Sequence, residues 1–318
     1  MVVPMLLLLL IKKLLLNIMS SIALFGALES GLIYALVALG VLISFRILDF
    51  PDLTADGSFP LGGAVFAVCV THGINPWFAC AFGAMAGAGA GFLTGWLHVS
   101  LKIMQLLASI LVMVALYSIN LRIMGSPNLS LLGQDSVFSP FFNATNTNQY
   151  WVQPLVILGF VLVAKFFMDW FFSTEIGLSI RATGVNLRMT QAQGINTSRS
   201  LLLGLAISNG LIGLAGALFV QTQGAADISI GIGTIVVGLA AVIIGETLIP
   251  GKRFVVITLA VIVGAVLYRA FIALALGSNT LQKIGFGPQD LNLITAILVV
   301  LALRLPAIKS YFKRKLKA

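Results

Sequence analysis

The sequence has few charged residues for its length. Only 9% of its 318 residues are Asp, Glu, Lys or Arg, whereas 59% are hydrophobic. A soluble domain carries about a quarter charged residues, because its surface must be hydrated. This shortage excludes soluble enzymes, nucleic-acid-binding proteins and disordered scaffolds. We therefore expect an integral membrane protein whose surface faces the lipid bilayer and that binds no nucleic acid.

Metal-binding and catalytic motifs are also lacking. Cys69 and Cys80 stand in apolar or Gly/Ala-rich stretches, and a disulfide scaffold or a zinc site needs more cysteines or closer spacing. The two histidines have no neighbouring ligands at metal spacing. Residues 245–252 resemble a phosphate-binding loop, but five residues separate the glycines where four are needed, and Arg253 stands where Ser or Thr would bind magnesium. We expect no metal, no cofactor, no catalytic residue and no ATPase site in this chain.

Long apolar segments dominate what is present. A membrane-spanning helix needs roughly 20 apolar residues, and barrel strands would instead alternate apolar and polar residues. The chain has nine helix-like candidates, rich in Gly, Ala, Leu and Val: 20–46, 58–73, 76–100, 103–124, 151–172, 200–222, 230–249, 254–276 and 290–306. We predict an all-α polytopic membrane protein of about nine transmembrane helices, which form one domain over residues 20–318.

The residues before the first of these segments do not fit the pattern. Their Leu run is too short to span a bilayer, and Lys12 and Lys13 would lie on the outside. Three interpretations stay open for residues 1–19: a signal-like extension, an interfacial helix, or a translation start at Met19.

The placement of basic residues predicts the orientation, because cytoplasmic loops are enriched in lysine and arginine. With the loop 173–199 inside, Arg122 and Lys283 fall outside among the basic residues after residue 19. The Asn-bearing loop 125–150 is then outside, and the C-terminus is inside. The residues expected inside are Arg46, Lys102, Arg181, Arg188, Arg199, Lys252, Arg253, Lys309, Lys313, Arg314, Lys315 and Lys317.

A weak internal repeat relates two parts of the chain. Residues 30–42 read SGLIYALVALGVL and residues 209–220 read NGLIGLAGALFV, and each is followed by an aspartate-bearing polar stretch and a Gly-rich apolar segment. The copies are an odd number of segments apart, so they would cross the membrane in opposite directions. Such inverted repeats are typical of transporters, whose substrate path lies near the repeat interface.

Glycines recur at every fourth position in the segment 76–100. Gly83, Gly87, Gly91 and Gly95 form a flat stripe on one helix face, where another helix can approach closely. We interpret this stripe as a packing surface; a helix that slides during transport would use the same surface.

The polar segment 175–200 is long for a loop. Gly184 and Gly194 bracket about nine residues that include Arg188 and Met189, and we expect a short helix there whose turns the glycines supply. One interpretation is a solvated connector. The other is a docking helix that inserts into a partner and transmits its motion.

This segment and the helix after it resemble the permeases of ABC importers of the branched-chain amino acid type. Those permeases show T-x-x-G-x-x-x-R-A, then G-I-N, then A-G-A-L. The matching residues here are Thr174, Gly177, Arg181 and Ala182, then Gly194, Ile195 and Asn196, then Ala215, Gly216, Ala217 and Leu218. The first helix is also similar to the family's opening helix, through Tyr34, Ala35, Leu36, Ala38, Leu39 and Gly40. The resemblance spans roughly residues 20–306.

The resemblance implies the permease subunit of a bacterial ABC importer, a multi-pass protein of the plasma (inner) membrane. It would carry a small polar solute, an amino acid, using ATP hydrolysed by a separate ATP-binding subunit. The other implied partners are a periplasmic or lipoprotein solute-binding protein and a second permease, identical or similar, that completes the pathway. The residues expected to couple to the ATP-binding subunit are Glu175, Gly177, Arg181, Ala182, Gly184, Arg188, Met189 and Gly194.

The stretch FPDLTADGSFPLGG at residues 50–63 departs from the family's N-F-A-H-G-like step. It looks like a less studied branch in which aromatic amino acids are among the suspected substrates, so the substrate identity stays open. We place Asp52 and Asp56 at the cytoplasmic side, either in a solvated loop that caps the next helix or at an inner gate or second partner contact. Asp227 has the matching outer position, at the entrance or facing the binding protein.

Charged residues within apolar segments are costly, and they mark either buried pairs or functional positions. Lys165 and Asp169 are four residues apart on one helix, so they can pair. For Glu29 and Arg269 both interpretations stay open. The residues expected to line a pathway or gate are Glu29, Asp52, Asp56, Ser208, Asn209, Gln221 and Asp227.

Two other classes of protein remain as alternatives. An ion-coupled secondary transporter with inverted repeats would use Glu29, Asp169 and Glu246 as relay groups. A self-powered carrier does not need the long polar segment 175–200, and this favours the ABC permease. A membrane scaffold or assembly factor is disfavoured by the polar groups in both halves of the chain.

Overall fold

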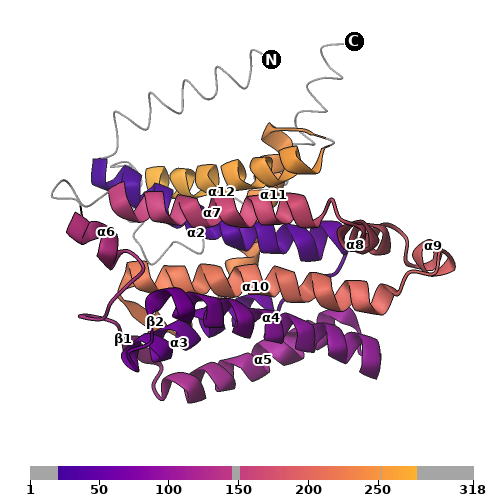
Figure 1. The fold of residues 1–318 in the computed structure, drawn as a ribbon. Coiled ribbons are helices and arrows are strands. Elements are labelled where there is room, and N and C mark those ends of the chain that lie inside the picture. The colour runs from indigo at the N-terminus through magenta and orange to yellow at the C-terminus, as the bar shows by residue number, and fades with distance from the viewer. Residues whose placement is uncertain (1–20, 145–150, 252, 278–318) are drawn as a thin grey trace, which may run out of the picture.

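The described part of the chain is a bundle of helices with one short β-ribbon (Figure 1). A computed structural model describes residues 21–144, 151–251 and 253–277. Its elements in chain order are α2 (Ser21–Val41), the π-helix η1 (Leu42–Ile47), α3 (Ala55–Thr71), α4 (Pro76–Leu101), α5 (Gln105–Met124), β1 (Asn128–Ser130), α6 (Ser139–Ala144), α7 (Val152–Phe171), α8 (Glu175–Val185), α9 (Leu187–Ala192), α10 (Thr197–Gln223), β2 (Ala225–Asp227), α11 (Thr234–Leu248) and α12 (Phe254–Gly277).

The helices in the described ranges agree with the predicted segments. Among the described residues, six spans are long and apolar enough to cross a membrane: Leu24–Ile47, which combines α2 with η1, and α4, α5, α7, α10 and most of α12. The helices α3 and α11 are shorter, with 17 and 15 residues. Eight of the nine predicted segments are thus helices, and the all-α polytopic fold is confirmed. The ninth segment, 290–306, and residues 1–19 lie outside the described residues, so the count of nine stays a prediction.

Local capping chemistry explains where several helices begin and end. The side chain of Asn75 accepts a hydrogen bond from the Trp77 amide at 3.0 Å, and Pro76 supplies the first residue of α4. Asn196 caps α10 in the same way, through the Arg199 amide at 3.1 Å. Both helices end at a residue in the left-handed conformation, which an α-helix cannot continue through.

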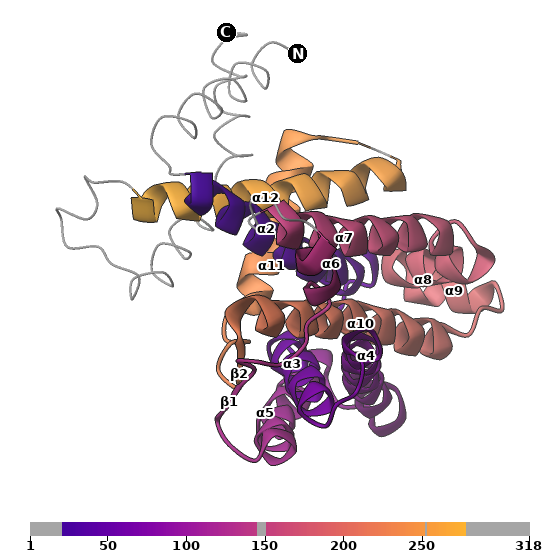
Figure 2. The ribbon, with the colours of Figure 1, turned by 60° about the vertical axis from the view of Figure 1, so that its left-hand side comes forward.

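The helix α10 occupies the middle of the bundle. Figures 1 and 2 show α3, α4 and α5 on one side of it, and α2, α7 and α12 on the other. It packs against α2, α3 and α4, while α2 packs in turn against α11 and α12. One large apolar core extends through these contacts and connects the two sides.

The glycine stripe of α4 lets α10 approach closely. A Cβ atom added to Gly87 would lie 2.3 Å from the carbonyl oxygen of Asn209, and one added to Gly91 would lie 2.2 Å from the carbonyl oxygen of Leu205. These distances leave no room for a side chain, so only glycine permits the contact. The prediction of a packing surface is confirmed.

The β-ribbon lies at one end of the bundle. The strands β1 and β2 pair in antiparallel orientation, with Asn128 opposite Asp227. The Val137 amide donates to the side-chain oxygen of Gln221 at 2.9 Å, and this ties the segment before α6 to α10. Figure 1 shows α8 and α9 at the opposite end of the bundle. In the predicted orientation the ribbon faces outward and α8 and α9 face the cytoplasm.

Candidate pathway and coupling site

A cluster of buried polar side chains lies at the centre of the bundle. Asn209, in the middle of α10, is fully buried; its Nδ2 donates to Asp52 Oδ2 at 2.6 Å, and its Oδ1 accepts from Ser58 Oγ at 2.8 Å. Asp52 is only 1% exposed and also accepts from the Thr54 amide at 2.9 Å. A buried carboxylate needs such partners, because without them it is strongly destabilising. The cluster therefore holds the segment before α3 against α10.

The segment 48–54 folds back into the bundle, where Asp52 and Thr54 are buried. Thr54 and Thr94 share a hydrogen bond of 2.7 Å between their hydroxyls, and this links the segment to α4. The placement of Asp52 and Asp56 at the cytoplasmic side stays a prediction, but the prediction of a solvated loop is wrong, because Asp52 and Thr54 are buried. The reason is that the polar side chains of this segment find buried partners on helices far along the chain.

Asp56 joins the two short helices α3 and α11. Its Oδ2 accepts from the Gly233 amide at 3.1 Å, and its Oδ1 accepts from the Ile235 amide at 2.9 Å. These amides begin α11, and the free N–H groups and dipole of a helix N-terminus favour a negative charge. A Cβ atom at Gly231 would lie 2.0 Å from the Asp56 carbonyl oxygen, so the two segments are in direct contact. One carboxylate thus holds the N-termini of both short helices together.

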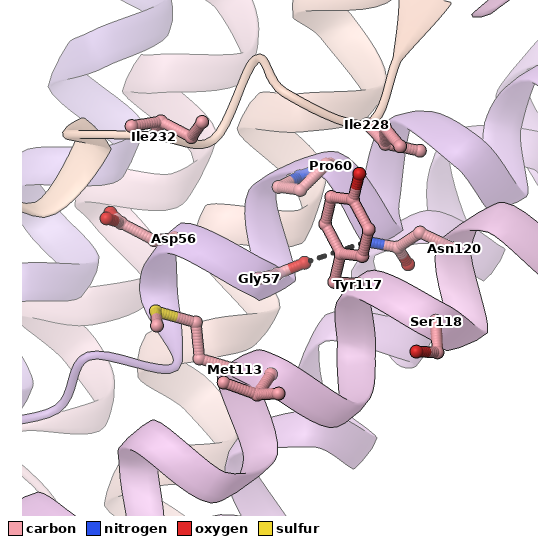
Figure 3. A pocket seen from close by; sticks show the side chains of 10 residues that line it. Asp56, Gly57, Pro60, Met113, Tyr117, Ser118, Asn120, Ile228 and Ile232 are labelled. Atoms are coloured by element: carbon pink, nitrogen blue, oxygen red, sulfur yellow. Dashed lines mark hydrogen bonds between the residues drawn. The ribbon is translucent and has the colours of Figure 1, made fainter. Parts of the chain in front are cut away.

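A cavity of about 370 Å³ lies beside Asp56 (Figure 3). None of its α5 residues was predicted from the sequence, although Tyr117, Ser118 and Asn120 stand within about one turn of a mostly apolar helix. That grouping of polar residues is the signal that the sequence offered. The cavity is lined by Asp56, Gly57 and Pro60 of α3, by Met113, Val114, Tyr117, Ser118 and Asn120 of α5, and by Ile228 and Ile232 before α11.

The other predicted pathway residues lie apart from this cavity. Ser208 donates to a backbone oxygen of α2 at 2.7 Å and so joins α10 to α2. Gln221 and Asp227 make structural hydrogen bonds near the β-ribbon. Glu29 is half-buried on α2 and interacts with the end of α10. Arg269 lies over an aromatic ring of α2, 3.8 Å from its centroid.

In the part of the chain that the structure describes, two ion pairs involve charged residues of the spanning helices or their ends. Lys165 pairs with Asp169, as predicted, and Asp169 also accepts from the Thr258 hydroxyl of α12 at 2.8 Å. Arg46 and Glu246 pair at 3.0 Å and join η1 to α11. Two of the carboxylates that an ion-coupled carrier would use as relay groups therefore have structural partners.

The segment 175–200 contains the two short helices α8 and α9 and the start of α10. Thr174 caps α8, and the Asn186 side chain caps α9 by accepting from an amide of its first turn at 3.0 Å. The predicted turn at Gly184 is wrong, because Gly184 lies inside α8 and Asn186 makes the break. Gly194 has a φ of +80° and supplies the second turn, as predicted. The helix α9 has six residues instead of about nine.

Gly184 lies against the end of η1. A Cβ atom at Gly184 would lie 1.8 Å from the Ile47 carbonyl oxygen and 2.9 Å from the Leu48 Cα, so the two backbones touch. Leu48 packs in turn against Gly204 of α10. Asp52 follows a few residues later, so a short chain of contacts connects α8 with the central polar cluster. A π-helix such as η1 is rare and is frequently found at functional sites.

The end of α8 and the helix α9 present apolar and basic side chains to water. Val185 is 86% exposed and Met189 is 61% exposed, and Arg188 is exposed between them. On the spanning helices, exposed apolar residues are expected because these helices face lipid. The helix α9 lies beyond the ends of the spanning helices (Figure 1). An exposed apolar patch at that place marks a surface that contacts another protein. The remaining predicted coupling residues, all in α8, are Glu175, Gly177, Arg181 and Ala182.

Comparison with known proteins agrees with this arrangement. The family described as "Branched-chain amino acid transport system / permease component" matches residues 23–304. The chain is 41% identical over 276 residues to the "Tyrosine transport system permease protein" of Clostridioides difficile (strain R20291), covering 86% of this chain and 88% of that protein. It is 26% identical over 289 residues to the "Ribose import permease protein RbsC" of Escherichia coli (strain K12), covering 88% of this chain and 84% of that protein.

The family match and the six apolar spans have direct consequences for this chain. It is a multi-pass protein of the bacterial inner membrane and the transport component of an ABC transporter. It works with an ATP-binding subunit. The chain belongs to the permease family of the branched-chain amino acid transport systems.

Proposed function

We propose that this chain forms, with a second permease, the pathway of an importer for an aromatic amino acid. Support for the substrate comes from the relative named as a tyrosine transport permease, at 41% identity. The relative named as a ribose import permease is more distant, at 26% identity. In this proposal the chain is a single transmembrane domain over residues 20–318, and it hydrolyses no ATP itself.

The contact between α8 and η1 is the observation that carries the coupling mechanism. The ATP-binding subunit docks on α9, where Arg188 offers a planar charged group for a carboxylate and Met189 offers an apolar side chain. When ATP binding moves the docked subunit, α8 moves with it. The backbone contact between Gly184 and Ile47 then carries the displacement through η1 towards Asp52.

The central cluster converts this displacement into a change of the pathway. The hydrogen bonds that join Asn209 to Asp52 and Ser58, at 2.6 and 2.8 Å, are present in one arrangement of the bundle and broken in the other. Packed cores of this kind have discrete arrangements and do not deform continuously. ATP binding thereby shifts an equilibrium between two arrangements of the bundle. A solute-binding protein delivers the substrate at the opposite end, beside the β-ribbon.

The packing of the helices supports an inverted repeat. The helix α2 packs against α11 and α12, and α10 packs against α3 and α4. In addition α3 packs against α4, as α11 packs against α12. The pattern is unchanged when α2, α3 and α4 are exchanged with α10, α11 and α12, as expected for two copies of opposite orientation. The substrate path then runs where α3 and α11 meet, at Asp56.

The proposal is tested with the permease, the ATP-binding subunit and the solute-binding protein in liposomes. We expect uptake of labelled tyrosine that requires ATP on the side of α9 and the binding protein on the side of the β-ribbon. The permease alone should neither hydrolyse ATP nor take up tyrosine. Uptake by the permease alone, driven by an ion gradient, would refute the proposal and support a secondary transporter.

A further inference from the structure

We infer that the cavity between α3 and α5 is a substrate subsite that recognises an amino acid whose aromatic side chain carries a hydrogen-bond donor at its far end. The inference rests on the proposed function, because it takes an amino acid as the transported molecule. Its basis is one unpaired buried acceptor, one carboxylate, and the apolar wall between them.

The unpaired acceptor is the side-chain oxygen of Asn120. Asn120 is 1% exposed, and its Nδ2 donates to the Gly57 carbonyl oxygen at 3.4 Å. Its Oδ1 has no hydrogen-bond partner among the described residues. Turning the amide over would place Oδ1 against the Gly57 oxygen, so the orientation is fixed. A buried acceptor without a donor is destabilising, and in a cavity wall it marks the place where a ligand's donor belongs.

A mobile side chain lies beside Asn120 in the cavity wall. Tyr117 lies three residues before Asn120 on α5, hence on the same helix face, and its side chain also lines the cavity. Tyr117 is 54% exposed, and exposed side chains change rotamer within picoseconds to nanoseconds. Rotation of the Tyr117 ring therefore changes the space beside Asn120 without moving the backbone.

The carboxylate lies on the other side of the cavity. Figure 3 shows Asp56 and Asn120 apart, with Pro60 and Tyr117 between them. Each carboxylate oxygen of Asp56 accepts one backbone N–H, so lone pairs remain for a ligand's ammonium group. The positive charge of a ligand's ammonium group beside Asp56 would also offset the energetic cost of placing the Asp56 carboxylate within the membrane.

The wall between the two polar groups suits an aromatic ring. Pro60 and Tyr117 offer flat surfaces, and the Met113 sulfur can make favourable contacts with a ring edge. The cavity volume of about 370 Å³ lies at the lower end of the range of small-molecule sites, roughly 300–1,000 Å³. The ligand therefore has three parts. Its ammonium group lies at Asp56, its aromatic ring lies along the apolar wall, and a phenol or indole donor at the far end of the ring lies at Asn120.

The test compares two substrates that differ only in the donor. The complete transporter in liposomes takes up tyrosine or phenylalanine from saturating, preloaded binding protein, so the rates report steps after delivery. We expect wild type to prefer tyrosine, and Asn120→Leu to lower the tyrosine rate about fivefold to tenfold, the value of one hydrogen bond. The ratio of tyrosine to phenylalanine uptake should fall by the same factor, because phenylalanine has no donor to lose, and measurable phenylalanine uptake shows that the variant is folded.

Ser109→Ala provides a matched control. Ser109 is a buried polar residue on the same face of α5, three turns from Asn120 and outside the cavity, and its hydroxyl has backbone partners. It should leave the ratio of tyrosine to phenylalanine uptake unchanged. If Asn120→Leu also keeps that ratio, or if wild type prefers phenylalanine, the inference is wrong while the proposed function stands. If wild type takes up no amino acid with ATP and binding protein present, the proposed function itself fails.

Discussion

One methyl group added at Gly184 should uncouple ATP hydrolysis from transport. In Gly184→Ala the new Cβ atom would lie 1.8 Å from the Ile47 carbonyl oxygen, whereas real Cβ atoms essentially never approach another heavy atom within 3.0 Å. The neighbour is backbone and cannot rotate away. Either α8 or the end of η1 must therefore move by about 1 Å, and the contact that carries the motion is lost.

The magnitude follows from two opposing effects. Overpacking of this kind costs about 1–3 kcal/mol. The better helix propensity of alanine offsets about 1 kcal/mol of that cost. The net cost is on the order of 0–2 kcal/mol. A value of about 1.4 kcal/mol shifts the equilibrium about tenfold against the arrangement in which α8 presses on η1. This is too little to unfold the permease and enough to reduce transport.

Gly159→Ala on α7 is the matched control. It brings the same gain in helix propensity, but nothing lies within 4 Å of its added Cβ atom. The assay measures co-purification of the ATP-binding subunit, ATP hydrolysis, and uptake in liposomes. We expect Gly184→Ala to retain the subunit, because the exposed side chains of α9 are unchanged, and to lose about 90% of the uptake per ATP hydrolysed.

Two results would refute this reasoning. Transport by Gly184→Ala at the rate of Gly159→Ala would show that the contact with Ile47 carries no motion. Loss of the ATP-binding subunit from Gly184→Ala would show that this position belongs to the docking surface and not to the connection behind it.

Three further measurements address other parts of the structure. Asn209→Leu should lower the melting temperature of the purified permease, because the buried Asp52 carboxylate loses a hydrogen bond worth about 1.5–3 kcal/mol; an unchanged melting temperature would contradict a stabilising role for the cluster. Arg188→Glu should reduce co-purification of the ATP-binding subunit at least about tenfold, because losing a charged contact at an interface costs several kcal/mol; full retention would show that Arg188 is not at the interface. Leu132→Cys and Val185→Cys replace side chains that are 84% and 86% exposed, and an impermeant maleimide should label only the former in intact cells; the reverse pattern would overturn the orientation.

The helices and the docking segment were predictable because they follow from local sequence patterns. A run of about 20 apolar residues specifies a spanning helix wherever it occurs. The polar segment 175–200 stands out between two such runs, and its caps are local side chains such as Asn186. These features depend on neighbours in the chain, so the sequence alone contains them.

The central cluster was not predictable because its members are far apart in the chain. Asp52 and Asn209 are separated by 157 positions, and an aspartate-bearing turn has the same sequence whether it meets water or a buried amide. The sequence predicts a turn at Gly184, because glycine permits unusual backbone angles. In the structure Gly184 instead lets the backbone of α8 approach the Ile47 carbonyl group at the end of η1. The role of Asn120 likewise depends on a contact with a distant part of the chain, because its side chain bonds to the Gly57 carbonyl oxygen of α3.

The hydrogen bonds from the N-terminus of α11 to the Asp56 carboxylate also constrain how the protein is inserted into the membrane during its synthesis. The carboxylate is made 177 residues before the Gly233 amide that it binds. At about 5–20 residues per second, that amide follows about 9–35 s later. During this interval α3 lacks the helix terminus that stabilises its charge, and an unpaired carboxylate in hydrocarbon is costly. We therefore expect α3 to remain near the bilayer surface or with the insertion machinery until α11 has been made, so that the order in which the helices settle differs from their order along the chain.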